Sequence, residues 1–155
     1  MERKTKINAE NGRQDLLITR EFDLPLDLLF KAYVEPEIVE QWMSTKVVKL
    51  ECKPHGSWRY ETSDQQGNVV LRTNGVIHEF VPEQKITRTF QMENTPFPVQ
   101  LEFLVFERLT DETSKLTMQI VYKSPEDREA MLKLPFAAGI NMAHNRLEQV
   151  VKQLI

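Results

Sequence analysis

Apolar residues change their spacing along the chain, and these changes predict the order of secondary structure. The run Leu16–Phe22 predicts a strand. The dipeptide Asn11-Gly12 before it favours a tight hairpin turn, so residues 1–14 are expected to form either an extra hairpin strand or a flexible segment. Pro25 then opens a short helix, and Pro36 breaks that helix and opens a second one.

From Lys46 to Tyr122 apolar and polar residues alternate, which is the pattern of strands separated by short turns. The end of the chain returns to helical spacing. Ser124-Pro125 supplies an N-cap and a first-turn proline for a short helix. A longer helix is predicted from about Pro135, because an apolar stripe then recurs every three or four residues.

This order of elements predicts an α+β fold in which a curved antiparallel sheet wraps around a long C-terminal helix, with two short helices after the first long strand. An antiparallel sheet with one apolar face must cover that face, and the last helix is the long amphipathic element available to do so. No internal repeat, linker or low-complexity tract interrupts the pattern. Residues 1–155 are therefore expected to form one domain.

Composition and charge exclude several classes of function. The 155 residues carry a formal net charge of −3, and their scattered Lys and Arg provide no basic face for a nucleic acid. No apolar run approaches the roughly 20 residues that cross a bilayer, and no apolar signal core follows the charged start. We therefore expect a cytoplasmic protein without nucleic-acid or membrane partners.

Metal and cofactor chemistry is not expected either. The three histidines and the single cysteine, Cys52, lack the spacing of metal ligands. No phosphate-binding loop, dinucleotide fingerprint or nucleophile motif occurs. Cys52 follows Val48 and Leu50 at alternate positions, so it is predicted to be a buried structural thiol on the apolar face of a strand.

Several segments resemble the bacterial activator-of-Hsp90-ATPase-like family of the START/Bet v 1-like (SRPBCC) superfamily. They are Ile18–Pro25, Val34–Glu37 with Trp42, Pro54–Tyr60 and Gly75–Ile86. The resemblance spans nearly the whole chain and implies the helix-grip fold, with a cavity that binds or transforms small, mostly apolar molecules. Two positions depart from the family pattern. His55 replaces the first glycine of the usual pair, and Ile140 stands where tryptophan is common, which implies an altered pocket wall beside the long helix.

One predicted hairpin places two charged residues opposite each other. If Val81 pairs with Ile86, then Glu79 faces Arg88 on the concave, apolar side of the sheet. A slip of one residue sets His78 opposite Arg88 instead. An ion pair in that position would orient the polar end of a ligand. The alternative is a partly solvated structural pair.

The candidate ligand-binding residues are those predicted to face the space between sheet and helix. Most are aromatic or apolar side chains, which otherwise form ordinary core. A glycine within the helix indicates either space for a ligand or close packing on the sheet. The set is Trp42, Trp58, Tyr60, Ile77, Glu79, Arg88, Phe90, Phe103, Met118, Phe136, Gly139 and Met142.

Three functions are compatible with these features. The leading hypothesis is a protein that binds a small apolar molecule with one polar end. The second, also implied by the resemblance, is an enzyme of the cyclase, dehydratase or hydrolase type found elsewhere in the superfamily, in which Glu79, Arg88, Tyr60 or His144 would transfer protons. The third, implied by the resemblance, is an interaction module like the Hsp90 co-chaperone domain, whose partner would be a chaperone.

Overall fold

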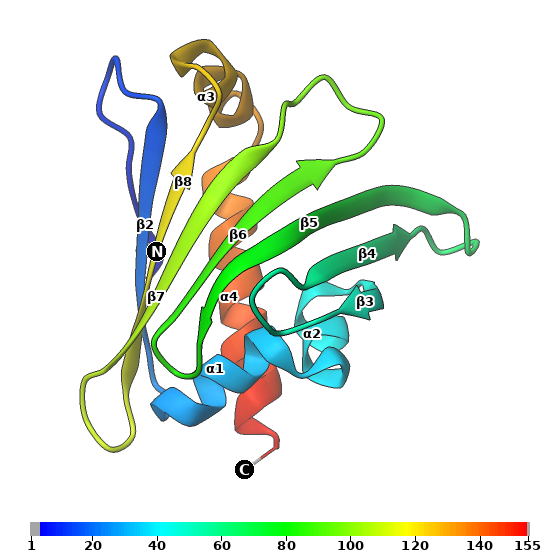
Figure 1. Cartoon of the computed structure of the whole chain (residues 1–155). Coiled ribbons are helices and arrows are strands. Elements are labelled where there is room, and N and C mark those ends of the chain that lie inside the picture. Colours follow the sequence, from blue (N-terminus) through cyan, green and yellow to red (C-terminus); the bar gives the residue numbers. More distant parts are fainter. Residues whose placement is uncertain (1–3, 155) are drawn as a thin grey trace.

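The computed structural model describes residues 4–154 and shows one curved sheet around the C-terminal helix (Figure 1). Within these residues the sheet has eight antiparallel strands in the order β1-β2-β8-β7-β6-β5-β4-β3. The predicted domain also includes residues 1–3 and 155, which lie outside the described part. The strands are β1 (Lys6–Asn8), β2 (Asp15–Phe22), β3 (Lys46–Leu50), β4 (Ser57–Ser63), β5 (Val69–Val81), β6 (Lys85–Met92), β7 (Gln100–Arg108) and β8 (Ser114–Val121).

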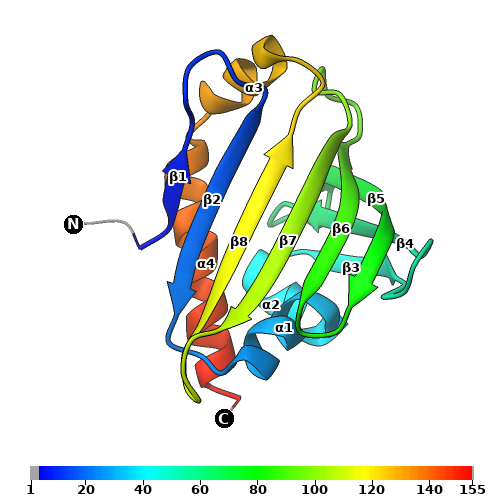
Figure 2. The ribbon, with the colours of Figure 1, turned by 60° about the vertical axis from the view of Figure 1, so that its left-hand side comes forward.

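The helices cover the concave face of the sheet. They are α1 (Leu26–Val34), α2 (Pro36–Met43), α3 (Pro125–Leu132) and α4 (Phe136–Lys152). The helix α4 runs along the concavity, with α1 and α2 across one end of the sheet and α3 near the other (Figures 1 and 2). The predicted arrangement of a curved sheet around a long helix is confirmed. No helix within residues 4–154 has the length and apolar character needed to span a membrane.

The two short helices are held to the sheet by aromatic side chains. Phe30 of α1 packs edge-to-face on Phe106 of β7, with ring centroids 5.0 Å apart. The elbow between α1 and α2 is closed by Trp42, whose Nε1 donates a hydrogen bond of 2.6 Å to the carbonyl of Ala32. Because both contacts are buried, they fix the helices that form one end wall of the interior.

The turn between β5 and β6 is tighter than the sequence predicts. Val81 pairs with Lys85, not with Ile86. The reason is a four-residue turn in which the carbonyl of Val81 accepts a hydrogen bond from the amide of Gln84. Pro82 precedes Glu83, which has a positive φ of 61°, as a type II turn requires at its third position.

A bulge between Ile77 and Glu79 then shifts the inward and outward alternation of β5 by one residue. Ile77 is buried and pairs with Arg88, whereas Glu79 is exposed. After the bulge Phe80 takes the inward position and packs on Phe30 of α1, with ring centroids 5.6 Å apart. The predicted pairing of Glu79 with Arg88 is therefore wrong, and so is the alternative that sets His78 opposite Arg88.

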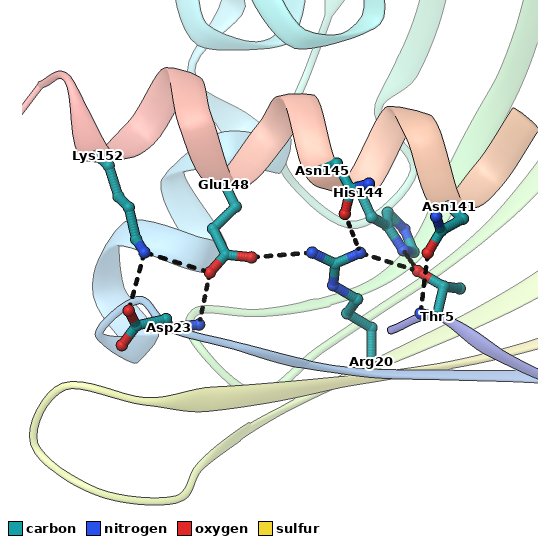
Figure 3. Close-up of polar contacts among 8 residues, drawn as sticks. All are labelled: Thr5, Arg20, Asp23, Asn141, His144, Asn145, Glu148 and Lys152. Atoms are coloured by element: carbon teal, nitrogen blue, oxygen red, sulfur yellow. Dashed lines mark hydrogen bonds and ion pairs between the residues drawn. The ribbon is translucent and has the colours of Figure 1, made fainter. Parts of the chain in front are cut away.

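A buried polar cluster ties α4 to the edge of the sheet at β1 and β2 (Figure 3). Arg20 of β2, 1% exposed, donates to Glu148 of α4 at 2.9 Å and to Asn145 at 2.8 Å. Thr5 bridges to the same helix, because its hydroxyl lies 3.3 Å from Arg20 Nη1 and 2.9 Å from His144 Nδ1. This cluster fixes α4 close to β2. The helix is therefore set to one side of the concavity, and space remains between it and strands β4 and β6.

Candidate functional site

A cavity of about 360 Å³ lies between α4 and the inner faces of β4, β6, β7 and β8, and it is partly open to solvent. No residue of β2 lines it, in keeping with the position of α4 against that strand. Helices α1, α2 and α3 supply the remaining walls. The lining residues are Tyr33, Val39, Trp42, Met43, Tyr60, Arg88, Phe90, Met92, Gln100, Glu102, Met118, Ile120, Met131, Phe136, Ile140, Ala143, His144 and Arg146.

Most of the cavity surface is apolar, and methionine is prominent in it. Met43, Met92, Met118 and Met131 approach from α2, β6, β8 and α3, so four of the elements around the cavity each contribute one flexible thioether side chain. Methionine is unbranched and polarizable, and it adapts to the shape of a neighbour better than leucine or isoleucine does. The walls are therefore suited to apolar groups of more than one shape.

One side of the cavity carries an ion pair between neighbouring strands. Arg88 of β6 and Glu102 of β7 are directly opposed, and Arg88 Nε donates to Glu102 Oε1 at 2.9 Å. The second carboxylate oxygen accepts from Gln100 Nε2 at 3.0 Å. The Arg88 guanidinium carbon lies 5.2 Å from the centroid of the Trp58 ring. The side chains of Arg88 and Glu102 are 12% and 6% exposed, so this polar group sits inside an otherwise apolar interior.

The protonation states around the cavity follow from burial and from this pair. Burial, the largest single effect, opposes the charged form of Arg88, but Glu102 together with Tyr60 and Tyr33 outweighs it, so the pKa of Arg88 is raised. Burial raises the pKa of Tyr60, although the nearby Arg88 opposes the shift. Burial, together with the charge of Arg20, lowers the pKa of His144 to about 3. At neutral pH the cavity therefore holds a charged arginine, a neutral tyrosine and a neutral histidine.

Half of the predicted ligand-binding residues line the cavity. These six are Trp42, Tyr60, Arg88, Phe90, Met118 and Phe136. Trp58 and Ile77 are buried beside it but do not form its surface. Of the candidates for proton transfer, Tyr60, Arg88 and His144 line the cavity, whereas Glu79 does not.

Four predicted residues lie elsewhere. The Glu79 side chain is 50% exposed and pairs with Lys85 Nζ at 3.0 Å, because the bulge in β5 turns it outward. Phe103 is half-buried and alternates with the inward Glu102 and Leu104, so it lies on the outer face of β7. Met142 is 61% exposed on α4, and Gly139 is also exposed. A Cβ added at Gly139 would meet no atom within 4 Å, so neither ligand space nor close packing requires glycine there.

Glu102 and Gln100 are the functional candidates that the sequence prediction missed. Both occupy the inward face of β7 with Leu104 and Phe106. The alternation of β7 places Glu102 and Gln100 on one face with Leu104, so the sequence contains the signal. The opposite face carries Phe103 and other apolar residues, however, and this predicts that Phe103, not Glu102, faces the interior. Ile140, singled out in the sequence as a departure, does lie in the cavity wall.

Cys52 lies just beyond the end of β3 and is half-buried, and Val48 of that strand is exposed. The prediction of an apolar strand face running from Val48 to Cys52 is therefore wrong, because β3 ends at Leu50. Burial raises the pKa of the Cys52 thiol, which disfavours the reactive thiolate. Within residues 4–154 no three His, Cys, Asp or Glu side chains converge on a position for a metal ion.

Solved structures define the class of fold. The chain superposes on protein Ms6760 from Mycobacterium smegmatis with a TM-score of 0.81, at 21% identity, over 94% of this chain and 95% of that one. A protein from Rhodobacter sphaeroides gives a TM-score of 0.85, at 17% identity, over 96% and 99%. A protein from Arthrobacter aurescens gives 0.84, at 14% identity, over 96% and 91%. These likenesses confirm a fold of the helix-grip class.

Sequence comparison then identifies the family. The model of the family "Activator of Hsp90 ATPase homolog 1-like protein" matches residues 23–152, which is most of the chain. The chain belongs to this family, as its resemblance to bacterial members predicts. No curated protein matches it in sequence.

Proposed function

We propose that this protein binds a small molecule with an apolar body and one polar end in the cavity beside α4. The observation that carries the proposal is the cavity of about 360 Å³, which is mostly apolar and has the Arg88–Glu102 ion pair on its wall. That volume is within the range of small-molecule sites, about 300–1,000 Å³. Membership of a superfamily with interior cavities supports the same function.

An energetic argument favours an occupant of this kind. A dry cavity of 360 Å³ would cost about 9 kcal/mol, at roughly 24 cal/mol per Å³. A domain has a net stability of only about 5–15 kcal/mol. Water can fill the space, but the mostly apolar wall gives it few hydrogen-bond partners. An apolar body with a single polar end satisfies both the wall and the Arg88–Glu102 pair.

The test is a thermal-shift screen with a panel of alkyl and aryl compounds that carry one polar group. A ligand at about 100 times its dissociation constant stabilises the folded state by about 2.7 kcal/mol. For a domain of this size that corresponds to a rise in Tm of about 5–10 °C. Mass spectrometry of the native protein from cells would show in parallel whether a small molecule co-purifies.

Two tryptophan variants on one helix provide a matched control. Ile140 lines the cavity, whereas Met142 is exposed on the opposite side of α4. Ile140→Trp is expected to abolish the thermal shift, and Met142→Trp is expected to preserve it. If no compound shifts the Tm of the unmutated protein, or if both variants respond alike, the cavity is not the binding site.

A further inference from the structure

Two arginines, Arg20 and Arg128, are buried in the described part of this protein, and the side chain of a third, Arg88, is only 12% exposed. The three use their guanidinium groups differently. Arg20 bonds through both terminal nitrogens, to Glu148, Asn145 and Thr5. Arg128 does the same, to the carbonyl of Asp15 and to Glu129.

Arg88 has the reverse pattern. Its Nε donates to Glu102, whereas Nη1 and Nη2 make no hydrogen bond with any residue in the range 4–154. Neither of these two nitrogens is among the fully enclosed polar atoms without a partner, a group that includes Nε of Arg20 and of Arg128. Since Arg88 lines the cavity, its terminal edge is the part that an occupant can reach.

The orientation of this edge is fixed before any ligand arrives. Arg88 Nε donates to Oε1 of Glu102, on the neighbouring strand, at 2.9 Å. The guanidinium carbon lies 5.2 Å from the centroid of the Trp58 ring. Gln100 in turn holds the second oxygen of Glu102 at 3.0 Å. The two terminal nitrogens of a guanidinium present parallel N–H groups that match the two oxygens of a carboxylate. A preorganised donor pair of this kind loses little side-chain entropy on binding.

The charges around the cavity select the charge of the ligand. Among the described lining residues, Arg88 and Arg146 are cationic and Glu102 is anionic, which leaves a net charge of plus one. His144 adds no charge at neutral pH, because burial lowers its pKa to about 3. A monoanion neutralises this set. A phosphate monoester, at about −1.5 to −2, would leave the lining as a whole with a net negative charge.

We infer that the natural ligand is a carboxylic acid with an apolar body, bound as its monoanion with the carboxylate on Nη1 and Nη2 of Arg88 and the body against the methionine-lined walls. This inference rests on the proposed binding function and specifies the chemical class of the ligand. Arg146 contributes at the rim, where it is exposed and its Nη1 donates to Ser44 Oγ at 2.9 Å and to the carbonyl of Trp42 at 3.4 Å. Both acceptors are neutral, so the full charge of Arg146 attracts anions.

The experiment compares three probes of one chain length by isothermal titration calorimetry: decanoate, decanol and methyl decanoate. Hydrogen bonds to a charged group predict that decanoate binds at least about tenfold more tightly than decanol or the ester. In the double variant Arg88→Met/Glu102→Met this ratio is expected to fall to about one. Both charges are removed together so that no unpaired charge remains in the interior. Arg59→Met, which changes an arginine paired with Glu93 away from the cavity lining, is expected to keep the ratio.

The outcomes separate the two proposals. Equal affinities for decanoate and decanol in the unmutated protein would overturn the carboxylate inference and leave the binding function standing. The same conclusion would follow if the double variant kept its preference for decanoate. Absence of binding by all three probes would overturn the inference together with the function on which it rests. The ligand comparison needs only the unmutated protein, so it tests the inference even if the double variant does not fold.

Discussion

Filling the cavity should stabilise the protein and weaken its binding of ligands at the same time. Ala143 lies on the α4 side of the cavity and is partly buried, so Ala143→Leu directs three additional carbon atoms into the open space. At about 0.8 kcal/mol per buried CH₂ the upper limit of the gain is about 2.4 kcal/mol. Ordering the longer side chain costs about 0.5–1 kcal/mol. We therefore expect a net stabilisation of about 1–2 kcal/mol.

The assay is urea unfolding followed by tryptophan fluorescence, because Trp42 and Trp58 are both buried in the folded protein. Gly139→Ala is the matched control on the same helix. Its added Cβ meets no atom within 4 Å and does not reach the cavity, so the gain of about 1 kcal/mol comes from helix propensity alone. Both variants should therefore be more stable than the unmutated protein, and only Ala143→Leu should lose affinity for decanoate.

Two results would refute this reasoning. A loss of stability in Ala143→Leu would mean that the space beside α4 is already packed, since overpacking a filled core costs about 1–3 kcal/mol. Unchanged decanoate affinity in a stabilised Ala143→Leu protein would mean that the ligand occupies another part of the molecule. An opposite movement of stability and binding is the trade-off expected where a protein keeps a space open for function.

Three further predictions concern the frame around the cavity. Glu148→Leu should lower the unfolding free energy by about 3–5 kcal/mol in urea titrations, because it leaves Arg20 buried without its carboxylate. The pKa of His144 is about 3 in the folded protein against an ordinary 6.5, so the unfolded chain takes up the extra proton. The stability that the neutral ring provides is complete above pH 6.5 and falls as the pH drops toward 3, by up to about 1.4 kcal/mol per unit. His144→Asn should flatten that part of the stability profile; an unchanged slope would exclude this histidine as its cause. Gly75→Ala should cost about 1–3 kcal/mol in the same titration, since its Cβ would overlap the carbonyl of Thr89.

The order of elements was predictable because its signals are local. The elbow between α1 and α2 follows from Pro36, which takes the first position of the second helix. The start of α3 follows from Ser124, whose hydroxyl accepts from the amide of Asp127 at 3.1 Å. The apolar stripe of α4 required a covering surface, and the curved sheet provides it. The first two features depend on residues within one or two helical turns of each other, and the stripe of α4 is a repeat at that spacing.

The errors in the candidate site arose where the outcome depended on contacts between distant elements. In β7 both faces carry apolar residues, and the inward face is decided by Phe106, which packs on Phe30 and Tyr33 of α1. That packing sets Glu102 inward and Phe103 outward. In β5 a single bulge turns Glu79 out. The shift of one residue in β5 removes Glu79 as the partner of Arg88, and the inward orientation of Glu102 on β7 supplies the observed partner.

The two interior ion pairs, Arg20–Glu148 and Arg88–Glu102, contribute differently to holding the fold together, and this difference indicates a functional role for the second. Arg20–Glu148 joins the sheet to α4, and the terminal nitrogens of the guanidinium all have partners, so the pair fixes the helix in place. Arg88–Glu102 joins two strands that are already paired through their backbones. Buried ion pairs are often no more stabilising than apolar residues of the same size, so cohesion of the sheet gives little reason for the second pair. The terminal nitrogens of Arg88 have no hydrogen-bond partner among residues 4–154, and Arg88 lines the mostly apolar cavity beside α4. In the proposed complex, a ligand carboxylate supplies the missing acceptor.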